Sequence, residues 1–223
     1  MAKFNKVQLT TNWFDERDQN VWFDLESRCV CAHFARLVRE AGLTLSSGWG
    51  ILGEYLRPPQ PMRYELVAGL HRTLPNIDIR EYASLGSADK KRYFLGLIVG
   101  LVKEVAEHGG CEADPFLDVA GEVLRQDLKN VWEWKRGRKI SPDGKHRVRV
   151  WVHHELRAFQ LKFEIRKSQV VVFEKVLLVE GAPDELVLNA VLGELSWPGD
   201  DMLVLSAKPG GGSPVEIALP GLH

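Results

Sequence analysis

The chain has 223 residues, a formal net charge of -1, 45% hydrophobic residues and 26% charged residues. This length can bury a substantial core in one large domain or two small ones, and the ordinary composition excludes a largely disordered chain. The balanced charge excludes a general binder of polyanions.

Compartment can be predicted from the cysteines and from the apolar runs. Three cysteines, an odd number without disulfide-like spacing, favour a reducing compartment. Residues 1–19 lack the continuous apolar core of a signal peptide, and the best apolar run, residues 93–102, is about half the length of a membrane span. We therefore expect a cytoplasmic protein that does not contact a membrane.

The first part of the chain predicts helices. Apolar positions recur at three- and four-residue steps, and serine, aspartate, proline and glycine fall where helices start or stop. A short helix within residues 77–85 is an open alternative to a loop. The expected helices cover residues 15–41, 46–56, 61–74, 77–85, 88–108 and 114–136.

After Gly137 the apolar period changes to two, which predicts strands. The expected strands cover residues 145–155, 158–166, 169–180, 193–197, 202–207 and 215–219, with one short helix at 184–192. The sequence therefore predicts an α+β fold: an N-terminal bundle of five or six helices in residues 1–136, followed by an antiparallel meander in residues 137–223. The two regions are expected either as two domains or packed together as one unit.

Cys29, Cys31 and His33 stand at alternate positions and suggest a metal site. On a helix, however, Cys29 and His33 lie one turn apart and face inward, while Cys31 points away. A site assembled from Cys29, His33, His108 and Cys111 is the alternative. We expect no metal site and, because a thiol on an apolar face is usually unreactive, no cysteine nucleophile.

Other motifs for chemistry are weak. The three glycines of "SGWGILG" match a dinucleotide-binding pattern but follow a predicted helix instead of a strand. His153 and His154 would face opposite sides of a strand. We therefore predict no catalytic residue and no cofactor.

A basic stretch stands out between residues 135 and 149, where seven Lys or Arg residues accompany a single acid, Asp143. Such a stretch can bind nucleic acid or an acidic protein surface, or it can be the solvated side of a hairpin. The predicted partner-binding residues are Arg136, Arg138, Lys139, Lys145, Arg147, Arg149 and Trp151.

Residues 138–219 resemble a β domain of small uncharacterised bacterial proteins, some of which are immunity proteins of polymorphic toxins. The resemblance rests on a turn of the type S-x-D-G-K, a short E-x-R segment, and a tryptophan followed by a K-x-P-G-like loop. The matching residues are Ser141, Asp143, Gly144, Lys145, Glu155, Arg157, Trp197 and Lys208 to Gly210. The helical half has no counterpart in this group.

The resemblance implies a non-enzymatic protein that inhibits a cognate toxin by stoichiometric binding. Contact could also run through the acidic start of the first helix, at Asp15, Glu16, Asp18 and Asp24. One alternative is a nucleic-acid-binding or defence-associated accessory protein that uses the basic stretch. A second alternative is an enzyme whose site is assembled from scattered residues.

Overall fold

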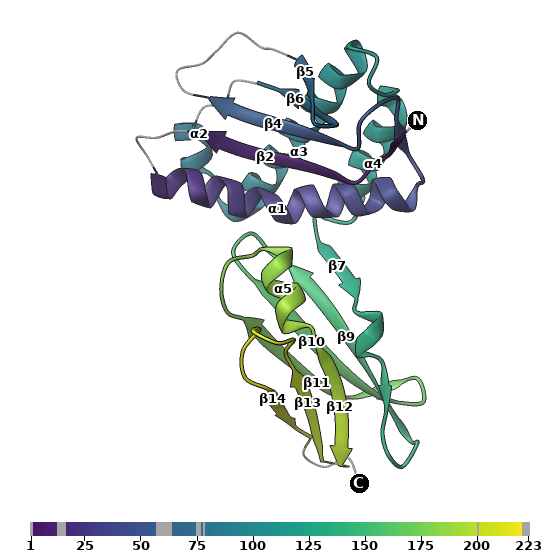
Figure 1. The fold of residues 1–223 in the computed structure, drawn as a ribbon. Coiled ribbons are helices and arrows are strands. Elements are labelled where there is room, and N and C mark those ends of the chain that lie inside the picture. The colour runs from purple at the N-terminus through teal and green to yellow at the C-terminus, as the bar shows by residue number, and fades with distance from the viewer. Residues whose placement is uncertain are drawn as a thin grey trace. The chain divides into compact units, whose positions relative to one another are not determined.

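The computed structural model describes residues 2–12, 17–56, 64–74, 77, 79–199 and 201–219, with only the backbone described for residues 12, 17–20, 56 and 79. The chain forms two compact units, Met1–Asn130 and Val131–His223 (Figure 1). The boundary expected between residues 136 and 137 therefore falls inside the second unit.

The first unit is built on a mixed sheet of four strands in the order β2, β4, β6, β5. β2, β4 and β6 are parallel, and β5 runs antiparallel to β6. A separate two-stranded sheet pairs β1 with β3. The strands are β1 (Ala2–Lys3), β2 (Lys6–Asn12), β3 (Thr44–Leu45), β4 (Gly50–Leu56), β5 (Tyr64–Val67) and β6 (Leu70–Thr73).

Helices cover one face of this sheet, as the ribbon of Figure 1 shows. They are α1 (Arg17–Glu40), α2 (Ile79–Ser84), α3 (Ser87–Glu107) and α4 (Ala113–Arg125). Phe23 of α1 packs edge-on against Tyr55 of β4, and a Cβ on Gly53 of the same strand would lie 2.7 Å from Leu101 of α3. The α1 and α3 helices therefore share the face on which alternate β4 side chains are buried.

The predicted N-terminal helix bundle is wrong, although the chain does combine helices and strands. The interval 46–56 holds β4, and residues 64–73 of the interval 61–74 hold the hairpin of β5 and β6. β2 was missed altogether, although Val7 and Leu9 alternate with polar residues there as in a half-buried strand. A short apolar run fits the helical and the strand period equally well. Whether these segments form helices or strands therefore depends on how they are buried against the helices.

The β5–β6 turn shows why the hairpin escaped sequence reasoning. Its two central residues, Ala68 and Gly69, both have positive φ values, 50° and 79°. Two-residue hairpin turns of this kind usually carry Asn-Gly or Asp-Gly, and alanine hides the signal. Trp49 compensates, since its backbone N–H donates to Gly69 O at 2.6 Å and its indole donates to Ala68 O at 3.0 Å.

The last helix of the first unit ends earlier than predicted. α4 stops at Arg125, and Asp127 and Leu128 follow with φ values of 54° each. A left-handed conformation cannot continue a helix. The chain then enters β7 (Asn130–Glu133) where the sequence pattern predicted helix up to residue 136.

Among the described residues, the second unit holds two sheets, in which β8 to β11 and β12 to β14 pair antiparallel. One has five strands, β11-β10-β9-β7 with β8 also paired to β9, and the other has the order β12-β13-β14. The elements are the 3-10 helix η1 (Lys135–Gly137), β8 (Lys139–Ile140), β9 (His146–His154), β10 (Phe159–Lys167), β11 (Val170–Val179), α5 (Glu185–Val191), β12 (Glu194–Gly199), β13 (Met202–Ser206) and β14 (Val215–Ala218).

Alternate side chains of both sheets form one core. Val148, Val150 and Val152 of β9 are at most 1% exposed, and they share the core with Leu203 and Leu205 of β13. α5 begins where the Asp184 side chain accepts a hydrogen bond from the Leu186 N–H. Because these valines of β9 face the core, the residues between them face outward.

Candidate functional site

The basic stretch forms a hairpin made of η1, β8 and the first half of β9. β8 pairs antiparallel with β9, with Lys139 opposite Val148 and Ile140 opposite Arg147. Because Val148 is buried, its neighbours Arg147 and Arg149 point to the other side of the sheet. The alternation predicted for this strand thus places the two arginines on the outer surface.

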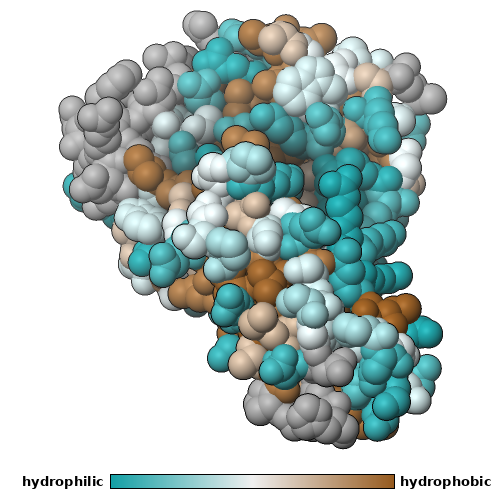
Figure 2. All heavy atoms as spheres, turned by 60° about the horizontal axis from the view of Figure 1, so that its bottom comes forward, coloured by the Kyte–Doolittle hydropathy of each residue, from teal (hydrophilic) through white to brown (hydrophobic). Residues whose placement is uncertain are grey.

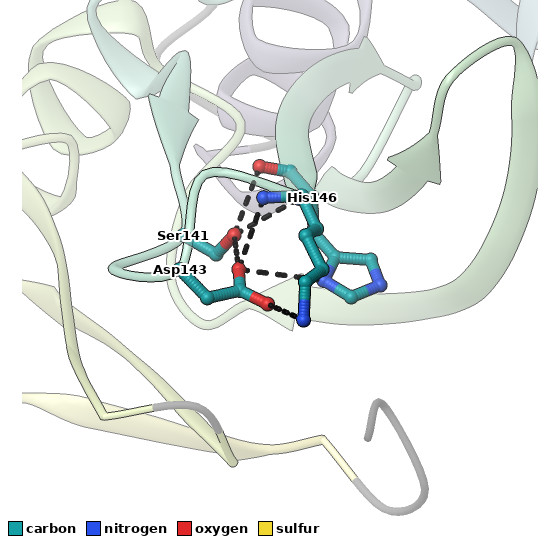
Figure 3. A network of polar contacts seen from close by, with 4 residues as sticks. Ser141, Asp143 and His146 are labelled. Carbon is teal, nitrogen blue, oxygen red and sulfur yellow. Dashed lines mark hydrogen bonds and ion pairs between the residues drawn. The ribbon is translucent and has the colours of Figure 1, made fainter.

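A polar network fixes the turn of this hairpin (Figure 3). The Ser141 hydroxyl donates to Asp143 Oδ1 at 2.5 Å and accepts from the His146 backbone N–H at 2.9 Å. The Lys145 N–H donates to the same carboxylate oxygen at 3.0 Å. The hydrogen bond from the Ser141 hydroxyl and that from the Lys145 backbone hold the pKa of Asp143 at about 2. The S-x-D-G-K motif is therefore a rigid, charged turn.

Serine, aspartate and histidine meet here, but their roles differ from those in a hydrolase. The Ser141 hydroxyl donates its hydrogen bond to Asp143 Oδ1, and its contacts with His146 involve backbone atoms. The His146 ring nitrogen Nδ1 lies 3.9 Å from Asp143. A nucleophilic serine needs the imidazole as its proton acceptor, so this network stabilises a turn and does not activate the hydroxyl.

Several of the predicted binding cations are already paired. Arg138 forms a two-pronged contact with Glu133, with Nε at 2.6 Å from Oε1, and Arg149 Nε lies 3.8 Å from the same carboxylate. These arginines lower the pKa of Glu133. Lys145 Nζ lies 3.4 Å from Asp143. Three of the seven Lys and Arg residues of the stretch are therefore paired, with two carboxylates between them.

The remaining cations of the predicted binding set are Arg136, Lys139 and Arg147; Lys135, outside that set, is exposed as well. Among the residues that the structure describes, none of the three has an ion pair. Arg136 and Arg147 are exposed, whereas Lys139 is half-buried and, opposite Val148 in the register, lies on the other side of the sheet from Arg147. These three residues, which we call the free cations of the hairpin, are the part of the predicted set that is available to a partner.

The sheet next to the free cations carries mixed charge. Trp151, half-buried, lies opposite Lys162 of β10, whose Nζ is 3.1 Å from Glu164 and 2.9 Å from Glu174. Burial acts to raise the pKa of Glu164, but Lys162 and other donors outweigh it and lower the pKa. Figure 2 shows one face of the molecule, on which hydrophobic residues lie in small groups among hydrophilic ones. The cations of the hairpin thus do not extend into a continuous positive track on this sheet.

The Cys-x-Cys-x-His stretch lies in the middle of α1, as predicted, but Cys31 is buried and does not face away. Cys29, Cys31 and His33 are 1%, 4% and 0% exposed. The reason is that α1 packs against β2 on one side and against α3 and α4 on others, so most of its circumference is covered. Burial, followed by the nearby Cys29, raises the pKa of Cys31 to about 12, which leaves an unreactive thiol.

One ring nitrogen of His33 contacts the residue that follows α4, while its buried Nδ1 has no hydrogen-bond partner among the described residues. Its Nε2 lies 2.9 Å from Gln126 Oε1, and the Gln126 amide donates to Glu122 at 2.8 Å. This geometry favours a neutral ring that donates through Nε2. Burial lowers the pKa of His33 more than the hydrogen bond to Gln126 raises it.

The alternative metal site from Cys29, His33, His108 and Cys111 is not assembled. His108 stacks on Tyr64 with ring centroids 4.1 Å apart, and burial raises the pKa of Cys111 to about 11. Within the described ranges, no group of three or more His, Cys, Asp or Glu side chains could hold a metal ion. His154 is buried and contacts Pro183 O at 3.2 Å, whereas His153 is half-buried on the other side of β9.

The acidic start of the first helix offers less than the sequence suggested. Asp24 accepts hydrogen bonds from the Thr10 hydroxyl at 2.9 Å and from the Thr11 N–H at 2.8 Å. It therefore joins α1 to β2. Asp15 and Glu16, and the side chain of Asp18, lie outside the described residues.

Sequence reasoning missed a buried ionic cluster in the first unit. Glu26 is 0% exposed and pairs with Lys90, and the Tyr82 hydroxyl also donates to it. The only available signal was a glutamate on the apolar stripe of α1, because its partners stand 56 and 64 residues further along the chain.

Comparison with known proteins found no matching family model, no matching curated protein and no matching solved structure. No helix in the described part of the chain is long and apolar enough to cross a membrane.

Proposed function

We propose that this chain is a non-enzymatic protein-binding protein, and that its partner is a bacterial toxin that it inhibits by stoichiometric binding in the cytoplasm. The observation that carries the proposal is the presence of three free cations, Arg136, Lys139 and Arg147, on a hairpin where the other cations of the predicted set, Arg138, Lys145 and Arg149, are paired. The rigid turn at Ser141 and Asp143 holds the hairpin in place before a partner arrives. Preorganisation of this kind reduces the entropy lost on binding.

Three fixed charges suit an acidic patch on a protein better than a nucleic acid. A nucleic-acid binder that contacts roughly six to ten phosphates loses affinity steeply with salt. Here Glu133 and Asp143 neutralise other cations of the hairpin, and Glu164 and Glu174 lie on the same sheet. Phosphates would meet these carboxylates, whereas the acidic and basic residues of a protein surface can complement both kinds of charge.

Inhibition of a toxin is the specific form of binding that the resemblance of residues 138–219 implies. The S-x-D-G-K turn, the best-defined part of that resemblance, is also the element that holds the free cations. An inhibitor of this kind acts by covering a surface of the toxin and needs no catalytic group of its own. The proposed toxin therefore carries an acidic surface next to its active site or assembly surface.

Coexpression tests the proposal. The chain is produced together with the product of a neighbouring toxin gene, and growth and complex formation are measured. We expect rescue of growth and a stoichiometric complex on gel filtration. The triple variant Arg136→Glu, Lys139→Glu and Arg147→Glu should weaken the complex by at least about tenfold, mainly through slower association. Lys103→Glu, an exposed charge reversal in the first unit, serves as the control.

The nucleic-acid alternative is tested on the same variants. Labelled single- and double-stranded oligonucleotides are titrated at several salt concentrations, and fluorescence anisotropy is recorded. Steeply salt-dependent binding that the triple variant abolishes would replace our proposal with the alternative. A triple variant that still binds and neutralises the toxin as the wild type does would also contradict it.

A further inference from the structure

A groove opens between the two sheets of the second unit. It lies at the β11 edge of the five-stranded sheet, whereas the hairpin of β8 and β9 lies toward the other edge. Among the described residues, the larger sheet has five strands and the smaller has three, and a hollow remains between them beside Leu161 of β10 and Leu177 of β11. A pocket of about 390 Å³ fills this gap. Its apolar wall includes Leu161, Leu177, Val179, Val191, Leu205 and Val215.

Strand edges border the groove. β11 is the last strand of its sheet and β14 the last of the other, within the part of the chain that is described. Such strands present unpaired backbone N–H and C=O groups along their free edges. On the outer face of β11, opposite to Leu177 and Val179, the apolar residues Val176 and Leu178 are 53% and 65% exposed. An extended peptide backbone can satisfy these groups, which a compact small molecule would leave unpaired.

Two residues of opposite charge, Lys175 and Glu180, lie beside the groove. Lys175 lies opposite Phe163 in the sheet register, so it points to the same inward side as Leu177 and Val179. It is nevertheless exposed, and Glu180 follows directly after the strand and lines the pocket. No hydrogen bond or ion pair joins Lys175 or Glu180 to the other side chains that the structure describes.

We propose that the groove binds an extended segment of a protein partner as an additional antiparallel strand along β11. Two apolar side chains of the segment enter the pocket opposite Val179 and Leu177, and an acidic residue two positions further faces Lys175. A basic residue just before the first apolar position faces Glu180. The segment therefore reads, from its N-terminus, basic, apolar, any, apolar, any, acidic.

A second copy of this chain does not fit the same place. Residues paired across two strands lie on the same face of the sheet, whereas neighbours along one strand lie on opposite faces. When two copies of a strand pair antiparallel about a two-fold axis, one residue must therefore lie opposite its own copy. The centre of β11 lies between Glu174 and Lys175. The two central registers therefore place Glu174 against Glu174, or Lys175 against Lys175. Like charges directly opposite each other destabilise strand pairing, and the strand is thereby protected from self-association.

The experiment uses the full chain and a displayed library of random short peptides. We expect selection on the wild-type chain to enrich the stated pattern. For the enriched peptides, made synthetically, Leu178→Arg and Lys175→Glu should each weaken binding by at least about tenfold, and Lys175→Glu should select a basic residue where the wild type selects an acidic one. Leu186→Arg, at a residue 78% exposed outside the pocket, and Lys103→Glu are the matched controls.

Backbone chemistry separates strand addition from simple occupation of the pocket. N-methylation of the amides that face β11 should abolish binding if the peptide adds as a strand. Unchanged binding of the methylated peptide would overturn the proposal, as would a library selection that enriches no pattern. A concentration-dependent dimer that Leu178→Arg abolishes would assign the groove to a second copy. The triple variant of the free cations should bind the peptides normally, so this test is independent of the proposed toxin-binding surface.

Discussion

Lys90 Nζ lies 2.8 Å from Oε2 of Glu26, a carboxylate that is fully buried. The same ammonium group lies 4.5 Å from the ring centroid of Tyr82, whose hydroxyl donates to Glu26. One buried charge thus joins α1, α2 and α3.

Removing the cation from this pair should be strongly destabilising, because the carboxylate would remain buried without its counter-charge. We expect Lys90→Met to lower the free energy of unfolding by about 3–5 kcal/mol in urea denaturation. Arg92→Met, which breaks an exposed pair with Asp89, should cost less than about 1 kcal/mol. Adding Glu26→Gln to Lys90→Met should restore part of the loss, and equal effects of Lys90→Met and Arg92→Met would refute this interpretation.

His33 should make stability depend on pH. Because burial lowers its pKa in the folded state, the unfolded state binds more protons once the pH falls below the unfolded value of about 6.5. Stability should therefore decrease as the pH falls from there, and level off below the folded pKa. His33→Gln should show a smaller decrease between about pH 7 and 5 than the wild type. An identical pH profile for the two proteins would contradict a neutral, buried imidazole.

Asp143 should remain ionised until the pH falls to about 2. Its folded pKa of about 2 lies below the ordinary 3.8, so its contribution to stability is present above the ordinary value and is lost as the pH falls through about 2. We expect Ser141→Ala to raise this pKa, measured by NMR titration of the carboxyl carbon. Lys145→Ala should raise it less, since the backbone N–H that contacts Asp143 remains. A larger shift in Lys145→Ala would mean that side-chain charge dominates the turn.

Gly69 should tolerate a side chain less well than other glycines of positive φ. A Cβ there would lie 2.6 Å from the Trp49 ring, whereas a Cβ on Gly42, at a φ of 70°, meets nothing within 4 Å. Gly42→Ala should cost about 1 kcal/mol of unfolding free energy, from backbone strain alone. Gly69→Ala should cost more, with a change in Trp49 fluorescence. Equal costs and unchanged fluorescence would show that the indole is free to move away.

The sequence predicted the second unit better than the first, for a physical reason. Strands of residues 146–179 carry a long, regular alternation, and one residue of slip would turn every valine of β9 outward. In the first unit the strands are short, and β4 contains two glycines, which obscure its period. The prediction for residues 46–56 then depended on the serines at their start and the prolines after them, which are equally typical of the ends of a helix.

Part of the candidate site was also within reach of the sequence. The outward direction of Arg147 and Arg149 follows from the valines between them. Whether a cation is free could not be predicted, because Glu133 lies in β7, a segment assigned to a helix. The β11–β14 groove was hidden for a similar reason: the strands were expected, but nothing in the sequence divides them between two sheets of unequal size.

The side chain of Asn130, the last residue of the first unit, is hydrogen-bonded to α1. Its amide donates to the Cys29 carbonyl at 3.1 Å, and its oxygen accepts from Arg36 at 3.2 Å. The last residue of this unit is thus attached to the central helix through its side chain, independently of the strand that continues beyond it. A polypeptide cut just after Asn130 keeps this attachment, and one cut just before it leaves the Arg36 guanidinium and the Cys29 carbonyl each short of a partner.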